Sequence, residues 1–372
     1  MTEGKTVEHL IKHIAAHFKT DTDALALEPI QHGTRQRHNV CRLRFGNKYY
    51  LLKQHDITTP VVEAGWTPLQ IEARVLELLY DNGCRVPQLF WKSERHHALL
   101  LEWCGESTLD ALAQRGEKSA QSLTPLLFTI LKEAGKIETC FTTHAAQLTP
   151  YVFRFNVQAV LQDLLARGKK VVGYLSHLSD RPMSVIEEKT FAESWDVLSA
   201  RLQNAPPTLG SLDNNARNLV IREASAFFID FASIGWNWQE MRLVQMLNSI
   251  GAFLVSPSET GNFVSLLDRE LVNAYAEWVS THRESCPPDE VAARVDGHHL
   301  LFYLSVIDQL LRAVAQPDAT ENRILLEAWG DPQKRFRSAI AHITGTRLSD
   351  DVHTNRVREI ITDFSTSAVP TT

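Results

Sequence analysis

The stretch that decides the fold is LGSLDNNARNLVIREASAFFIDF, which runs from Leu209 to Phe231. A polar segment containing Asp213 and Asn218 leads directly into an apolar strand, and a short polar turn connects this strand to a second one that ends in Asp230. The pattern predicts a β-hairpin with acidic and amide groups at its base. An Asp within FFIDF would be costly to bury without a partner, so we expect its carboxylate to bind a metal ion or to join a hydrogen-bond cluster.

The composition is that of an ordinary globular protein. The chain has 372 residues, of which 44% are hydrophobic and 22% are charged, and this length predicts two domains or two lobes. The net charge is -6 and the pI is about 6.2, so no basic surface for nucleic acid is expected. No apolar run reaches the roughly 18 residues that a membrane helix needs.

The N-terminal segment and the cysteines predict a cytoplasmic location. Residues 1–18 carry charges and histidines that interrupt the apolar pattern, so they do not resemble a signal peptide. The cysteines are odd in number, scattered and without CxxC spacing. This favours free thiols in a reducing compartment over a disulfide framework or a zinc site.

The first hundred residues predict a small five-stranded sheet with one inserted helix. Period-two alternation and a tight turn at Gly46-Asn47 indicate strands, and helical periodicity that ends at Asn82-Gly83 indicates the inserted helix. The expected elements are a first helix at 6–18, a strand, a polar loop and two further strands within 25–54, the inserted helix at 68–83, and strands at 86–93 and 96–104.

Helical periodicity dominates from Glu106 onward and is interrupted by the 209–231 hairpin. The expected helices lie at 107–114, 123–147, 153–168, 184–203, 237–255, 262–282, 289–316, 321–330 and 333–343. The last residues are expected to form a disordered tail. The predicted division is an N-terminal lobe at 1–101, a hinge at 102–106, a helical lobe at 107–365 and the tail at 366–372.

Five residues stand in the order that phosphoryl transfer from ATP requires. That reaction needs a cation on the phosphates, a divalent metal held by oxygen ligands and a base beside the acceptor hydroxyl. Kinases place a Lys on a strand and a Glu on the next helix, and here Lys53 ends a strand and Glu72 lies on the following helix. Kinases also place Asp-x-x-x-x-Asn before a hairpin that ends in a metal-binding Asp, as Asp213, Asn218 and Asp230 are placed here.

On these residues, the chain resembles the aminoglycoside phosphotransferase/choline kinase-like branch of the kinase fold, over about residues 28–250. The similar segments are a nucleotide loop and lysine strand at 33–53, a glutamate helix and Val-Pro strand entry at 71–90, a hinge at 99–109, a helix end at 142–148, and a catalytic loop and metal Asp at 212–236. The resemblance implies an α+β, bilobal protein-kinase-like fold, with a small antiparallel five-stranded N-lobe, one key helix and a large, mostly helical C-lobe.

The resemblance also implies a role for each residue of the motif. Lys53 would hold the α- and β-phosphates of ATP, and Glu72 would fix Lys53. Asn218 and Asp230 would ligate Mg²⁺, a hard cation that prefers oxygen ligands. Asp213 would accept or orient the proton of the acceptor hydroxyl.

The same resemblance implies further positions of the nucleotide site. The backbone from Glu102 to Cys104 would bind the adenine ring, and backbone N–H groups near Gly33 would cover the phosphates. The chain departs from the family at Ser211-Leu212, because relatives have His-Gly or His-Asn before the catalytic Asp.

Together these features predict a Mg-ATP-dependent kinase that phosphorylates a hydroxyl group of a small molecule. Only FASIGWN follows Asp230 before the next helical pattern, and no Ala-Pro-Glu follows, so the peptide platform of protein kinases has no room. Candidate pocket residues are Asp213, Trp236 and Trp238. Two alternatives stay open: a non-catalytic nucleotide-binding pseudokinase, motivated by the altered catalytic loop, and a less favoured protein kinase. The acceptor and the oligomeric state are left open as well.

Overall fold

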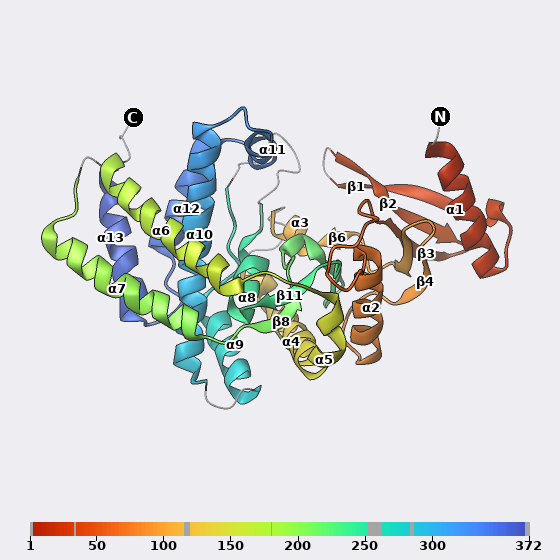
Figure 1. Cartoon of the computed structure of the whole chain (residues 1–372), viewed down its shortest axis with the longest axis horizontal. Coiled ribbons are helices and arrows are strands. Elements are labelled where there is room, and N and C mark those ends of the chain that lie inside the picture. The colour runs from red at the N-terminus through yellow and green to blue at the C-terminus, as the bar shows by residue number, and fades with distance from the viewer. Residues whose placement is uncertain are drawn as a thin grey trace.

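A computed structural model of the chain describes residues 3–32, 35–114, 120–179, 181–251, 262–282 and 286–368. Within them, the chain forms a small lobe and a larger helical lobe that lie side by side (Figure 1). The small lobe contains the predicted antiparallel five-stranded sheet, in the order β1-β2-β3-β5-β4. Its elements are α1 (Glu3–Phe18), β1 (Leu25–His32), β2 (Arg35–Phe45), β3 (Lys48–Gln54), α2 (Pro68–Asp81), β4 (Leu89–Ser93) and β5 (Ala98–Glu102).

Different helices cover the two faces of this sheet, because side chains alternate along each strand. On one face, Leu52 and Leu100 pack in a cluster with α1. On the other face, Leu51 and Leu99 pack with the apolar side of α2. Lys53 has the same parity as Leu51, so the strand directs its side chain toward α2.

Local signals set the ends of several elements of the small lobe as predicted. A capping box between Thr67 and Gln70 begins α2, and the helix ends at its C-cap Asn82. The predicted tight turn joins β2 to β3. The predicted polar loop after β1 is shorter than expected, because β2 already begins at Arg35 and pairs back with His32.

The larger lobe is mostly helical. Its helices are α3 (Leu109–Gln114), α4 (Ala120–Thr143), α5 (Ala145–Leu148), α6 (Val157–Leu178), α7 (Val185–Asn204), α8 (Gln239–Asn248), α9 (Arg269–His282), α10 (Pro288–Ala315), α11 (Thr320–Trp329), α12 (Pro332–Gly345) and α13 (Val352–Ala368). Its short strands are β6 (Ser107–Thr108), β7 (Val152–Phe153), β8 (Thr208–Ser211), β9 (Leu219–Arg222), β10 (Ser225–Phe228) and β11 (Ile234–Asn237). They form two small sheets, β10-β9-β6 and β7-β11-β8. None of the described helices is long and apolar enough to cross a membrane.

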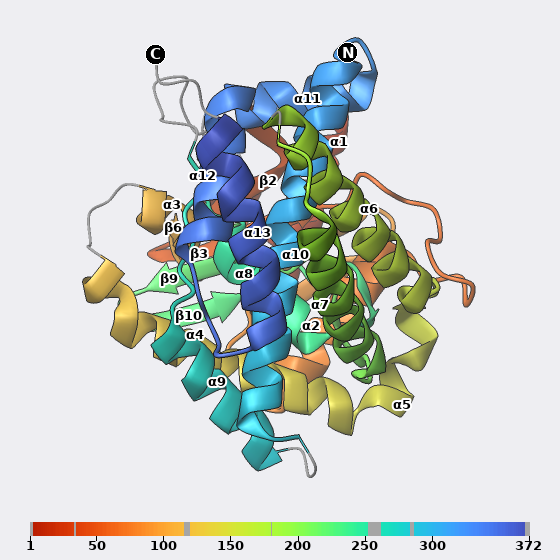
Figure 2. The same ribbon diagram turned by 90° about the vertical axis from the view of Figure 1, so that its left-hand side faces the viewer.

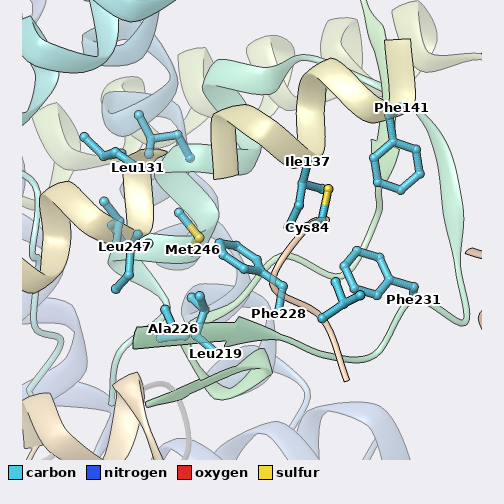
Figure 3. Close-up of a cluster of buried hydrophobic side chains, with 14 of the residues drawn as sticks. Cys84, Leu131, Ile137, Phe141, Leu219, Ala226, Phe228, Phe231, Met246 and Leu247 are labelled. Carbon is cyan, nitrogen blue, oxygen red and sulfur yellow. The ribbon is translucent and has the colours of Figure 1, made fainter. Parts of the chain in front are cut away.

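Two hydrophobic clusters hold the larger lobe together. In the first, Phe228 and Leu219 of the β9–β10 hairpin face Leu131 and Ile137 of α4 and Met246 of α8 (Figure 3). This cluster continues into the buried side of α2 and so joins the two lobes. The second cluster lies among α6, α7, α10, α12 and α13, and Figure 2 shows α13 between α12 and the α6–α7 pair.

Helix boundaries in this lobe differ from the prediction in three places. The helix expected at 153–168 is α6 (Val157–Leu178), because Val152–Phe153 forms strand β7 and the helix continues to Leu178. The helix expected at 262–282 begins only at Arg269, because Val264 forms a β-bridge with Ile250 and Asp268 Oδ1 then accepts from the backbone N–H of Leu271 at 2.8 Å. The helix expected at 237–255 ends at 248, and residues 252–255 lie outside the described part of the chain.

The C-terminal end also differs from the prediction. Helix α13 was not predicted, and it extends through Ala368. Residues 366–368 therefore belong to a helix and not to a tail, and residues 369–372 lie outside the described part. The side chains of Val357, Ile361 and Phe364 are buried, which explains why the short periodic segment is helical here.

Candidate active site

The loop between β8 and β9 carries the predicted catalytic Asp, and three hydrogen bonds hold its backbone. The hydroxyl of Ser211 accepts from the N–H of Asp213 at 3.3 Å, and the carbonyl of Ser211 accepts from Asn214 Nδ2 at 3.2 Å. The N–H of Ala216 donates to Ser249 Oγ at 3.0 Å. The buried Ser211 thus braces the loop.

The carboxylate of Asp213 is held from both sides but stays exposed. Asn218 Nδ2 lies 3.1 Å from its Oδ2, and Asn215 Nδ2 lies 2.5 Å from its Oδ1. Asn218 Nδ2 also donates to the Asp213 carbonyl at 2.9 Å. These bonds orient the carboxylate, and they use only the nitrogen of the Asn218 amide, which leaves its oxygen for a cation.

A buried arginine supports the strand that leads into this loop. Arg242 donates to the carboxylate of Glu138 and to the carbonyl oxygens of Thr208 and Asn237. A Cβ atom at Gly210 would lie 2.6 Å from Arg242 Cζ, so the close approach requires glycine. Nothing in the sequence pattern indicates this contact, since its members come from four separate elements.

Lys53 and Glu72 of the small lobe meet Asp230 of the larger lobe. Lys53 Nζ lies 2.9 Å from Glu72 Oε1, 2.8 Å from Glu72 Oε2 and 2.8 Å from Asp230 Oδ1. His55 Nε2 also lies 2.8 Å from Glu72 Oε2. The contact of Lys53 Nζ with Oε2 is an ion pair, and that of His55 Nε2 with Oε2 is a close polar contact without the alignment of a hydrogen bond. The predicted lysine, helix glutamate and hairpin Asp therefore form one cluster.

The two charges of the Lys53–Glu72 pair stabilise each other. Burial alone would raise the pKa of Glu72, but the charge of Lys53 and then the contact with His55 outweigh it and lower this pKa to about 2. Burial opposes the charge of Lys53, but Glu72 and Asp230 outweigh that effect and raise the pKa of Lys53. Both groups are therefore ionised throughout the neutral pH range.

The two predicted metal ligands are neighbours at the base of the hairpin. The N–H of Ile229 donates to the Asn218 carbonyl at 2.9 Å, which places Asp230 beside Asn218. Asp230 has a φ of +67°, a conformation that Asp adopts more readily than most residues and that recurs at functional sites. An amide oxygen and a partly exposed carboxylate are a donor set that fits Mg²⁺.

The predicted hinge connects β5 to β6 and passes over β9. A Cβ atom at Gly105, whose φ is +139°, would lie 3.3 Å from the Ile221 carbonyl, so this crossing also favours glycine. Arg222 Nη1 lies 3.2 Å from Glu102 Oε1 and 3.5 Å from the Trp103 carbonyl. The hinge is thus tied to the hairpin that precedes Asp230.

An apolar cluster lies next to this hinge. Cys104 is buried against Val220 and Phe227, with Ile229 at its edge. Burial, followed by the charge of Glu102, raises the pKa of Cys104 to about 12, so its thiol is neutral and acts as an apolar contact.

One predicted position is not tested, and two outcomes differ from the sequence prediction. Gly33 lies outside the described residues, so its role stays a prediction. Trp238 does not line a pocket, because its ring is buried and its Nε1 donates to the Ala205 carbonyl at 2.7 Å. His55 and an interlobe ion pair between Arg42 and Glu106 (2.5 Å) were missed.

Comparison with known proteins supports the fold assignment. No protein-family model matches the sequence, and no curated protein matches it. A structure from Ralstonia eutropha, described only as a candidate aminoglycoside phosphotransferase, aligns over 96% of this chain and 98% of its own, with 13% identity and a TM-score of 0.52. An aminoglycoside phosphotransferase from Alicyclobacillus acidocaldarius aligns over 91% and 93%, with 9% identity and a TM-score of 0.50. The chain therefore has the bilobal, protein-kinase-like fold of these structures.

Alanine substitutions of Lys53 and Glu72 test whether the two residues act as a unit. Each single change is expected to raise the apparent KM for ATP, and the double variant is expected to be no worse than the poorer single variant. The measurement is steady-state kinetics at varied ATP concentration. Full additivity of the two effects would show that the pair is not coupled.

Proposed function

We propose that the protein is a Mg-ATP-dependent kinase that transfers the γ-phosphate of ATP to a hydroxyl group of a small molecule. One observation carries the proposal: Lys53, Glu72 and Asp230, which come from three elements, meet in one cluster beside the loop of Asp213 and Asn218. The phosphotransferase described from Alicyclobacillus has the same fold, which agrees with the proposal.

Each residue then has a defined task. Lys53 would bind the phosphates, and Glu72 would hold Lys53 in place. The oxygens of Asn218 and Asp230 would hold Mg²⁺, which when bound neutralises charge on the phosphates. The oriented, exposed carboxylate of Asp213 would accept the proton of the acceptor hydroxyl as that oxygen bonds to the γ-phosphorus, while the bond from the γ-phosphorus to the β–γ bridging oxygen breaks and ADP leaves.

Two features support a small acceptor and a reducing location. Only residues 231–238 separate Asp230 from α8, and part of that stretch is β11, so no peptide platform follows the metal ligand. All five cysteines are among the described residues and are free thiols, which agrees with a cytoplasmic protein.

A phosphate-transfer assay tests the proposed function. The purified protein is incubated with Mg²⁺ and γ-labelled ATP, and with either a metabolite extract or a protein extract from cells. We expect label on a metabolite and little on protein. Label on a defined protein Ser or Thr, with no labelled metabolite, would favour the protein kinase.

The pseudokinase alternative follows from the Ser211-Leu212 departure and has its own outcome. If Mg-ATP raises the melting temperature of the protein but no extract yields a labelled product, the chain is a nucleotide-binding module. The hydrogen bond from the Asp213 N–H to Ser211 Oγ holds the backbone of the loop in place, which favours the kinase over the pseudokinase.

A further inference from the structure

His55 lies just after β3, two residues beyond Lys53, and its side chain is only 6% exposed. Because strand side chains alternate between faces, Lys53 and His55 point the same way, toward α2. Gln54 points to the other face, where its Nε2 lies 3.4 Å from the His96 carbonyl. The strand end therefore places the Lys53 ammonium and the His55 imidazole beside the carboxylate of Glu72.

The backbone of His55, like that of Lys53, is hydrogen-bonded to the neighbouring chain segment. Its N–H donates to the His97 carbonyl at 2.7 Å, which extends the pairing of β3 with β5 one residue past the Gln54–Ala98 pair. The imidazole thus reaches Glu72 from a paired strand end and not from a free loop.

Glu72 needs a partner besides Lys53. Its carboxylate is 1% exposed, so water cannot solvate its charge. Lys53 already divides its contacts between Glu72 and Asp230, and a bound nucleotide would add phosphate oxygens to that set. A buried carboxylate that loses part of its compensation tends to move or to take up a proton. Among the described residues, Glu72 is the side chain that the imidazole of His55 contacts, at 2.8 Å.

We propose that His55 is a positioning residue: its Nε2, carrying a proton, stays in the 2.8 Å contact with Glu72 Oε2 and so keeps Glu72, and through it Lys53, in place when nucleotide binds. The inference rests on the proposed function in that nucleotide is the ligand of Lys53. The lowered pKa of Glu72, to which the contact with His55 contributes, agrees with it.

Three variants of the full chain test the proposal by calorimetric titration with Mg-ATP. His55→Leu removes the donor and keeps an apolar side chain, and we expect it to weaken Mg-ATP binding about tenfold, the scale typical of residues that orient a ligand. His55→Gln can still donate, so we expect it to recover most of the affinity. Gln54→Leu, on the opposite face, is the matched control and should bind as the parent does.

The decisive comparison repeats His55→Leu in a Glu72→Ala background. Because His55 acts through Glu72, we expect no further loss of affinity there. Unchanged binding by His55→Leu, or an additional loss in the Glu72→Ala background, would overturn the proposal. Melting temperatures of all variants separate a general loss of folding from a specific loss of binding.

A nucleotide-free readout separates this proposal from the proposed function. In ¹⁵N-histidine NMR spectra of the unchanged protein, His55 is expected to carry a proton on Nε2, and its resonance should shift in Glu72→Ala. A proton on Nδ1 alone would overturn the positioning role. Failure of the unchanged protein to bind Mg-ATP, with the expected spectrum, would overturn the proposed function and with it the role toward nucleotide, while the contact itself would stand.

Discussion

Asp213→Asn is expected to slow turnover by about 10²–10⁴-fold, the usual contribution of a positioned base, and to leave the affinity for Mg-ATP nearly unchanged. The carboxylate is exposed and is held by the amides of Asn215 and Asn218. It is therefore oriented to accept the proton of an acceptor hydroxyl that reaches it from solvent. An Asn side chain has the same shape but cannot take up that proton.

The measurement is kcat with a metabolite that the unchanged protein labels, together with equilibrium binding of Mg-ATP. Asp350→Asn is a suitable control, because Asp350 is 82% exposed and pairs with Arg269 on the helical lobe. A variant of Asp213 that turns over normally, or one that loses only ATP binding, would require another residue as the base.

The parts of the fold that the sequence predicted are those that depend on local patterns. The period-two alternation at residues 40–45 and the tight turn at Gly46-Asn47 set the β2–β3 hairpin, and helical spacing together with Asn82-Gly83 set the end of α2. The order of the motif residues was also readable, because the Asp213–Asn218 spacing lies within one loop and Asp230 ends the hairpin that follows.

The parts that the sequence did not predict depend on contacts between distant segments. The contact of Lys53 with Asp230 joins residues 177 positions apart, and no local pattern measures that distance. His55 reads as an ordinary polar residue at a strand end, and only the placement of α2 against β3 shows that it contacts Glu72. Similarly, Trp238 lies just after β11, and only its packing in the second hydrophobic cluster shows that its ring belongs to the core.

Helix boundaries failed for the same reason. Residues 262–268 have enough apolar character for a helix, but pairing of Val264 with Ile250 competes successfully for their backbone groups. Helix α13 has a modest apolar stripe that becomes meaningful only because α6, α7 and α12 surround it. Tertiary packing decides in both places, as is common where intrinsic preference is weak.

Asp230→Asn is expected to weaken Mg²⁺-dependent nucleotide binding by roughly 10²-fold or more, since even residues that only orient a metal ligand contribute 10–100-fold. The substitution keeps the size of the side chain, and Asn tolerates the φ of +67° as well as Asp does. It removes the negative charge that faces the cation and Lys53 Nζ, which lies 2.8 Å from Oδ1. The fold should survive, because Glu72 still compensates Lys53.

Titration calorimetry with ATP in the presence of Mg²⁺ and in the presence of EDTA isolates this effect. For the unchanged protein we expect the affinity to fall sharply when Mg²⁺ is removed, whereas for Asp230→Asn the two affinities should be similar. The charge of Lys53 does not depend on the metal, so the residual binding that both proteins share in EDTA measures the metal-independent contacts, to which the lysine contributes. If Asp230→Asn binds Mg-ATP as tightly as its parent, Asp230 does not hold the metal. Its contact with Lys53 is then a structural ion pair between the two lobes.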